Sequence, residues 1–439
     1  MLSKNNHKQV AWVLFAGIMA SYLLMAFKFP HAYIIATYED LVGEWAQFFF
    51  FATTMLLAAR QAIVSEKFRL FFSLLALACL YVAGEEISWG QRIFNLSTPE
   101  FFNEHNLQKE TNLHNFFTGP ISTHLKQALE YAIAAGLIGY GLVYPWLLQR
   151  KVRWAQWLEG HGLAAPPLYL CPFFVVSGLL EIGLFHFNEA EIAEVLIPLA
   201  LGIMTLSYRS ASLQKIDIHD HPVWDKLPSR KLAGQTLLLF FTVITLALGT
   251  TFACYSSPRL GAEMTDRYLN GIDKFAGRYM RFGQWEIAAG LYHEVDEFDS
   301  GRASVQRNLF RCYDQLGKPE QAQQALNRAI EIDEQRLVKN PSSISARISL
   351  VRNYQLVDDL SKAHYYLQQA LETGLSKKNT DPQDPGTAYW LGRSYTLQGD
   401  YVSALQEFRR AVELNPQSLR YRKALIRTRD LLNEKEEKV

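Results

Sequence analysis

The sequence predicts an all-α protein: a polytopic transmembrane bundle of about seven helices, followed by an α-solenoid of helical repeats. Long apolar stretches with few charges fill the chain up to about residue 255. Beyond that point the chain is charged throughout, and no stretch is apolar enough to cross a bilayer. Small and large apolar residues also recur there at a regular interval, which indicates stacked helix pairs. We therefore expect a membrane domain at 1–255 and a soluble domain at 256–439.

The apolar stretches have the length of membrane spans. A hydrocarbon core about 30 Å thick is crossed by about 20 apolar helical residues. Seven stretches reach or approach that length: 10–27, 41–63, 68–88, 122–148, 166–187, 191–207 and 232–253. The first follows two lysines as a signal peptide would, but it is too long for one and lacks a small-residue cleavage site. We expect it to be retained.

The connecting loops predict the orientation, because Lys and Arg favour the cytoplasmic side. Positive charges precede the first stretch and follow the second, fourth and sixth, whereas the alternate loops hold few. This pattern predicts a multi-pass protein of a bacterial inner membrane, with its N-terminus in the cytoplasm and the soluble domain in the periplasm. The formal net charge of +1, without a basic run, argues against a nucleic-acid-binding protein.

The soluble domain repeats one arrangement of residues. A Tyr precedes a turn at Gly or Asp, and two Ala with a large apolar residue follow it; one copy is Tyr395, Gly399, Ala404, Phe408 and Ala411. These residues resemble the tetratricopeptide repeat (TPR) family over about 269–436. The resemblance implies paired helices stacked into a solenoid, whose groove binds a peptide or a partner protein. The alternative is that the repeats pack against their own membrane domain or dimerise.

The spacing of the repeats predicts their helix lengths. The repeats start near 269, 303, 344 and 385, so the first spacing is the family's 34 residues and the next two are seven longer. Seven residues are about two helical turns. We therefore expect longer second helices in the two middle repeats, with extra segments at Ile330–Asn340 and Leu371–Asp381. An amphipathic helix at 419–436 is expected to cap the stack.

Ionisable residues gather at one end of the spans. Charged groups inside membrane spans are costly and tend to be functional. Four apolar stretches each bring acids or a histidine to the end predicted to face the periplasm, from the second, third, fifth and sixth stretch respectively: Glu44 with Gln47, Glu85 with Glu86, Glu181 with His186, and Glu189 with Glu191 and Glu194.

The loop after the third stretch has a polar edge. Asn106, Gln108, Glu110, Asn112 and His114 occupy alternate positions, so an extended segment would place them on one side. We expect this loop to cover the outer mouth of the bundle with that edge facing the acids. The run GEEISWGQRIF followed by NxQxExNLHN resembles a signature of bacterial polytopic membrane proteins without an assigned activity. The resemblance covers about 38–207 and implies a grouping of these residues but no chemistry.

Three kinds of site are compatible with these residues. General acid–base catalysis would use Glu85, Glu86, Glu110 and His114. A lipid or lipid-linked ligand would be bound by Glu44, Trp89, Gln91, Arg92, Asn106, Gln108, Asn112 and Asn115, with Arg92 pairing to phosphate. A divalent metal such as zinc, which generates a nucleophile from water, would be held by His105, His114, His186 and Glu181. Membrane hydrolases of the alkaline ceramidase and adiponectin-receptor type have a similar helix count, but their His-x-x-x-His spacing is missing here.

A purely structural network, with Glu85 or Glu86 bonded to Arg92, is the alternative to all three. The isolated histidines His7, His31, His219 and His221 are expected to be solvated. The sequence as a whole predicts recruitment of a partner protein beside an outer-leaflet polar site, in envelope assembly, lipid-linked polymer handling or secretion. The rival interpretation is an enzyme that hydrolyses or transfers a lipid or lipid-linked substrate.

Overall fold

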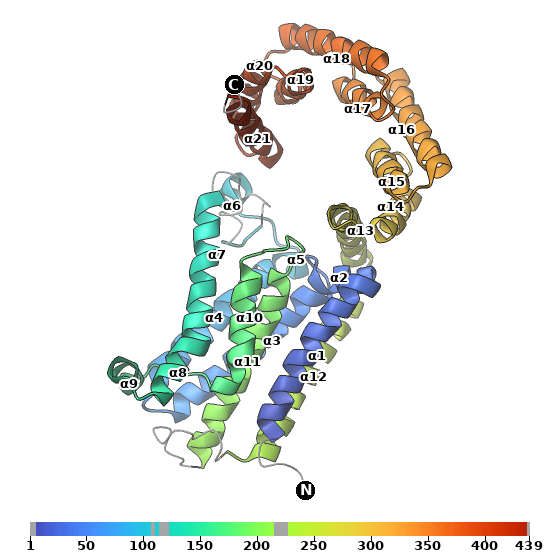
Figure 1. Cartoon of the computed structure of the whole chain (residues 1–439). Coiled ribbons are helices and arrows are strands. Elements are labelled where there is room, and N and C mark those ends of the chain that lie inside the picture. Colours follow the sequence, from blue (N-terminus) through green and yellow to red (C-terminus); the bar gives the residue numbers. More distant parts are fainter. Residues whose placement is uncertain (1–5, 107–109, 114–122, 215–226, 437–439) are drawn as a thin grey trace. The chain divides into compact units, whose positions relative to one another are not determined.

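The computed structural model describes residues 6–106, 110–113, 123–214 and 227–436 (Figure 1). No described residue lies in a strand. The described residues divide into two compact units. The bundle unit holds those up to Gly271, apart from 103–106 and Thr123, and the solenoid unit begins at Ile272.

The bundle unit is built from long helices that run alongside one another, with shorter helices between them. They are α1 (Asn6–Lys28), α2 (Pro30–Thr37), α3 (Val42–Val64), α4 (Arg69–Glu86), α7 (Thr123–Ile138) continuing through η4 (Gly139–Val143) into α8 (Tyr144–Gln149), α9 (Arg153–Gly160), α10 (Cys171–Glu181), α11 (Ala190–Leu213) and α12 (Ser229–Ser256). Short turns at η1 (Ser88–Gly90), α5 (Gln91–Phe94) and η5 (Leu168–Leu170) connect some of them, and α6 (Glu100–His105) follows α5. Helix α3 packs against α4, α11 and α12.

Five helices of the described chain are long and apolar enough to cross a membrane. They are α1, α3, the continuous run Gln127–Gln149, α11 and α12. The predicted count of about seven is not reached, because two predicted stretches give weaker helices. Helix α4 carries Arg69, Glu85 and Glu86 within its 18 residues, and α10 has only 11 residues.

The burial of these helices distinguishes a central helix from outer ones. In α11, 72% of the apolar window is buried, against 17% in α1 and in α12. Helix α11 is therefore central, and the outer helices turn large apolar side chains outward, among them Trp12, Leu24, Leu74, Leu238 and Phe241. An apolar surface of this kind marks contact with a membrane or a partner.

The solenoid unit is a curved row of paired helices. They are α13 (Pro258–Arg281), α14 (Trp285–Phe298), α15 (Ala303–Gln315), α16 (Pro319–Lys339), α17 (Ile344–Gln355), α18 (Leu360–Thr380), α19 (Pro385–Gln398), α20 (Tyr401–Leu414) and α21 (Leu419–Glu436). Figure 1 shows α15, α17, α19 and α21 on the inner side of the row and α16, α18 and α20 on the outer side. Helices α16 and α18 have 21 residues each, whereas α14 and α20 have 14. The difference equals the seven extra residues in the predicted repeat spacing.

Small residues allow the paired helices to approach closely. A methyl group on Gly392 of α19 would lie 2.7 Å from the Phe408 ring of α20. The turn between the same two helices uses Gly399 with a φ of 84°, a conformation that glycine adopts at little cost. In the third repeat Asp358 occupies the turn with a φ of 53°, which Asp tolerates better than most residues.

Helix α13 belongs to both units. The predicted boundary near 255 falls at the end of α12, at Ser256, but the compact bundle unit extends to Gly271, within α13. A methyl group on Gly271 would lie 2.9 Å from the side chain of Ile34 in α2. The first part of α13 is thus packed directly on the bundle.

Candidate functional site

The end of α4 is a tight reversal of the chain. Ser88, Trp89 and Gly90 have φ values of 45°, 54° and 78°, so the helix cannot continue. The Trp89 ring folds back over Gly84, where a methyl group would lie 2.8 Å from the ring atoms. Its Nε1 donates a hydrogen bond of 2.9 Å to Oε1 of Glu85. Glycine at position 84 therefore makes room for the indole that caps this helix.

The loop that follows is held against this reversal. Leu113 N donates to Oε2 of Glu85 at 2.7 Å. Oε2 of Glu110 accepts from the Ser88 hydroxyl at 2.9 Å and from the Asn112 amide at 3.1 Å. Both Glu85 and Glu110, two of the catalytic candidates, thus bind the loop to the helix end.

The predicted alternation of the loop is present where the structure describes it. Asn106, Glu110 and Asn112 are buried, whereas Thr111 is half-buried and Leu113 exposed. Gln108, His114 and Asn115 lie outside the described residues. The alternation therefore orders the loop as expected, although its buried edge serves packing and hydrogen bonding.

Gln91 fastens the same loop from the other side. Its Oε1 accepts from the backbone N–H of Thr111 at 2.7 Å, and its Nε2 donates to the Thr98 hydroxyl at 2.6 Å. The side chain of Arg92 lies outside the described part, so its predicted pairing with phosphate or with an acid stays a prediction.

A cation that no sequence pattern indicated joins this cluster from α13. The Arg267 guanidinium contacts Asp40 at 3.0 Å, Glu39 at 3.1 Å and Glu110 at 3.6 Å. Next to it, the Tyr268 hydroxyl lies 2.9 Å from Nδ1 of His31. Because residues after 255 were assigned to the soluble domain, nothing in the sequence pointed to these pairs.

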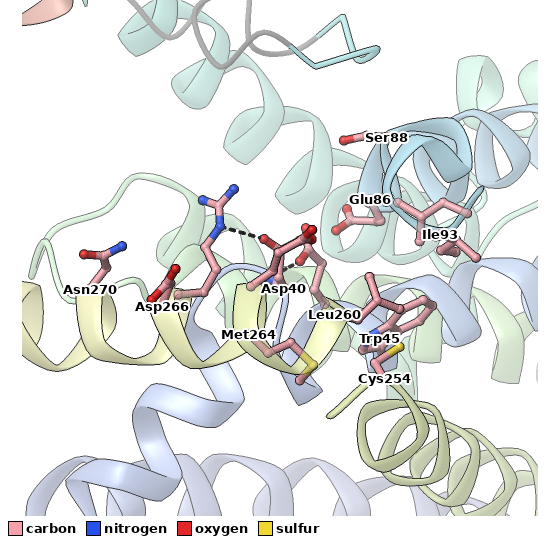
Figure 2. A pocket seen from close by; sticks show the side chains of 14 residues that line it. Asp40, Trp45, Glu86, Ser88, Ile93, Cys254, Leu260, Met264, Asp266 and Asn270 are labelled. Atoms are coloured by element: carbon pink, nitrogen blue, oxygen red, sulfur yellow. Dashed lines mark hydrogen bonds and ion pairs between the residues drawn. The ribbon is translucent and has the colours of Figure 1, made fainter. Parts of the chain in front are cut away.

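A cavity of about 330 Å³ lies within the bundle unit beside Arg267 (Figure 2). Its size is at the lower end for small-molecule sites. Five acids and one cation line it together with apolar side chains: Asp40, Glu44, Trp45, Glu86, Ile87, Ser88, Ile93, Cys254, Leu260, Glu263, Met264, Asp266, Arg267 and Asn270. In Figure 2 the carboxyl groups of Asp40 and Glu86 turn toward the same space. The lining is rich in carboxyl groups.

Glu86 differs from the neighbouring acids. It lines the cavity and makes no hydrogen bond or ion pair with any residue that the structure describes. Glu44, in contrast, accepts a hydrogen bond from the backbone N–H of Asp40. Of the two adjacent acids that end α4, Glu85 therefore holds the loop and Glu86 faces the cavity.

Further acids meet on the α11 side of the same layer. Fully buried Gln47 donates through Nε2 to Oε2 of Glu191 at 3.0 Å. The carboxyl groups of Glu44, Glu86, Glu181, Glu191 and Glu194 are close enough for electrostatic interaction. The acids of all four predicted stretches are thus electrostatic neighbours.

The histidines have other surroundings. His105 is exposed at the end of α6, and His186 is exposed in the turn before α11. That turn is organised by Glu189, whose carboxylate accepts the backbone N–H groups of residues 185–187. Among the described residues no three His, Cys, Asp or Glu side chains are placed to hold a metal ion. The metal site stays a prediction, since it includes His114.

Two histidines predicted to be solvated are not. His7 is buried, with Nδ1 3.0 Å from the Ser229 hydroxyl, and half-buried His31 bonds to Tyr268. His219 and His221 lie outside the described residues.

Family comparisons bear on the solenoid unit. Two models described as tetratricopeptide repeat match residues 279–340 and 385–418. The C-terminal region contains TPR repeats. Among solved structures, the chain is similar to TTC0263, a thermophilic TPR protein of Thermus thermophilus, at 18% identity over 36% of this chain and 80% of that one, with a TM-score of 0.24.

Two further solved structures give similar values. YrrB, described as a TPR protein with an unusual peptide-binding site, is 16% identical over 49% of this chain and 95% of that one, with a TM-score of 0.18. MamA is 18% identical over 38% and 85%, with a TM-score of 0.18. The comparison with curated proteins gives no match.

Proposed function

We propose that this chain is a membrane-embedded recruitment protein, in which the bundle unit lies in the bilayer and the TPR repeats bind a partner protein or peptide. The observation that carries the proposal is the set of repeats within 279–418. Stacked repeats of this type present an extended concave surface suited to a protein ligand. A protein that acts without a partner would not need such a surface.

The membrane part of the proposal is supported by the outward apolar side chains on helices of spanning length. The distribution of Lys and Arg supports an inner-membrane protein with a cytoplasmic N-terminus and periplasmic repeats. A tag at the C-terminus should then be digested by protease added to intact spheroplasts, while a cytoplasmic control protein survives. Protection of the tag until the membrane is opened would reverse the proposed orientation.

Recruitment would bring the partner beside the outer-leaflet polar site, in envelope assembly, lipid-linked polymer handling or secretion. A photo-reactive amino acid at Gln355, exposed on the inner helix α17, tests partner binding in living cells. We expect a discrete crosslinked product there and none from Gln368, which is exposed on the outer helix α18. If no exposed position on the inner helices α15, α17, α19 and α21 gives a crosslinked product, recruitment is contradicted.

A second candidate function is hydrolysis or transfer of a lipid or lipid-linked substrate. The Glu86 carboxyl favours it: it faces a cavity lined by acids and apolar side chains and bonds to no residue that the structure describes, so it is available as a general acid or base. Purified protein incubated with inner-membrane lipid extract should form a product detectable by mass spectrometry. Glu86→Gln should abolish that product, and Glu286→Gln, exposed on α14, should not. Identical lipid profiles with wild type and E86Q would exclude this function.

A metal-dependent form of this enzyme makes a separate prediction. Purified protein would contain a divalent metal such as zinc, and His114→Ala and His186→Ala would each lower the bound amount. Equal and negligible metal in all three proteins would remove the metal-dependent form.

A further inference from the structure

One arginine recurs at the same place in four consecutive inner helices of the solenoid. Each follows a leucine by two residues, in the order Leu-x-Arg: Arg311 in α15, Arg352 in α17, Arg393 in α19 and Arg427 in α21. They are separated by 41, 41 and 34 residues, the spacing of the repeats themselves. We call these four residues the arginine ladder.

Helix geometry places the ladder on the open side of the inner row. The leucines of the first three helices are buried between helices. A residue two positions further is turned by about 200° around the helix axis, so the arginines face away from that core. Arg311 and Arg427 are exposed, and Arg352 and Arg393 are half-buried. Figure 1 shows the helices that carry them lining the inner side of the row.

Three of the ladder arginines lie near one another. Burial lowers the pKa of Arg352, and the positive charges of Arg311 and Arg427 lower it further. None of the four makes an ion pair with a described residue. The positive charge of this surface is therefore available to a ligand.

A neighbouring arginine, in contrast to the ladder, has a structural role inside the solenoid. Arg307, one turn before Arg311, contacts the buried carboxylate of Asp333 at 3.4 Å and donates to Ser349 and Asn353 at 2.6 and 2.9 Å. Its charge is compensated inside the solenoid, unlike that of the ladder.

Aromatic side chains lie among the arginines near the C-terminal end of the row. Arg393 donates a hydrogen bond of 3.4 Å to the Tyr389 hydroxyl. The Arg420 guanidinium lies 4.3 Å from the centre of the Tyr389 ring and 4.7 Å from that of Trp390. Tyr389 is buried and Trp390 half-buried, so these rings pack against the arginine side chains rather than line the open surface.

The number of arginines favours a ligand with several acids. They come from four successive inner helices, and the charges of both Arg311 and Arg427 act on Arg352. A chain that carries several carboxylates pairs with more of them than a single small anion does.

We propose that the arginine ladder binds an extended acidic segment of a partner protein, one that carries several Asp or Glu residues. The proposal rests on the recruitment function and names the chemistry of the partner. The charge complementarity, the recurrence of the arginine in each repeat and the lack of ion pairs with described residues all support this occupant.

The test is fluorescence anisotropy with the purified full-length protein and labelled peptides. We expect four copies of Glu-Ser-Ser to bind, with affinity falling as salt is added, and the corresponding Gln and Lys peptides not to bind. Arg311→Glu combined with Arg427→Glu should weaken binding about tenfold or more, because attraction becomes repulsion. Arg409→Glu, at an exposed site on outer helix α20, should change it less than about twofold.

Several results would overturn the proposal. These are equal binding of the Gln peptide, an equal loss from R409E, or inorganic polyphosphate binding more tightly than the acidic peptide and losing affinity in the same variants. Circular dichroism checks the fold of each protein. If the variant with both Arg311→Glu and Arg427→Glu is unfolded, the variant with Arg311→Gln and Arg427→Gln replaces it. An unchanged affinity of that variant for the acidic peptide refutes the ladder. A crosslink at Gln355 without acidic-peptide binding would refute the ladder alone, whereas loss of the crosslink would refute recruitment.

Discussion

Replacing Arg267 by Met should weaken the attachment of α13 to the bundle unit. The guanidinium lies 3.0–3.6 Å from three carboxylates, and its side chain is 33% exposed, against 20% for Asp40 and 11% for Glu110. An exposed ion pair contributes about 0–1 kcal/mol, and breaking a buried one costs about 3–5 kcal/mol. This partly buried cluster falls between these limits, so we expect a loss of about 2 kcal/mol. Met keeps much of the apolar stem, so the loss reports the charge.

The measurement is the free energy of unfolding in mixed micelles of increasing SDS content. Combining Arg267→Met with Asp40→Asn in a double-mutant cycle should give a coupling energy of about 1 kcal/mol, because the two groups share one interaction. Arg259→Met is the control: its side chain is 41% exposed, its contact with Glu263 is 4.0 Å long, and its hydrogen bond to Asn95 is exposed, so it should cost about 1 kcal/mol or less. Strict additivity in the cycle, or an Arg267→Met variant as stable as wild type, would refute the assigned cluster.

Three further substitutions test local features of both units by equilibrium unfolding. Gly84→Ala should cost about 1–3 kcal/mol and shift the tryptophan fluorescence, because a methyl group displaces the indole above it; Gly136→Ala, with open space around it, should cause no loss. Asp384→Ala removes the N-cap of α19 and should cost about 1 kcal/mol at pH 7. Hydrogen bonds to its carboxylate lower the pKa of Asp384 in the folded state. The stabilisation by this N-cap is therefore fully present above the unfolded pKa of about 3.9 and is lost as the pH falls through the folded pKa. At that low pH the variant and the wild type should have the same free energy of unfolding. Asp333→Ala should cost about 3–5 kcal/mol, because it leaves the Arg307 guanidinium without its carboxylate, and equal stability of the variant would show that this network is not stabilising.

Local patterns were the most predictable part of this protein. The extra length of α16 and α18 follows from repeat spacing, since each repeat contacts its neighbours in sequence, and α21 follows from its amphipathic pattern. The burial of Asn106, Glu110 and Asn112 likewise follows from alternation within a few residues. The number of helices suited to crossing a membrane was harder to predict, because α4 and α10 lie near the limits of charge and length.

The candidate site was predicted only as a neighbourhood. Adjacency in sequence gave no reason to separate Glu85 from Glu86, but the reversal after α4 turns one to the loop and the other to the cavity. The misjudged histidines show the same limit, since the partners of His7 and His31 are 222 and 237 residues away. Spacing along the chain contains no information about such partners.

The sequence alone determined the all-helical class, the TPR repeats, the length of their helices and the layer that holds the acids. These properties depend on hydrophobicity and on periodicity over a few turns, which can be read along one chain. The tertiary structure decided that Arg267 of α13 meets Glu39, Asp40 and Glu110, and that Glu86 is left to the cavity. An ion pair forms only when side chains approach within a few ångströms, and for segments more than 150 residues apart that approach is set by the packing of the whole bundle unit.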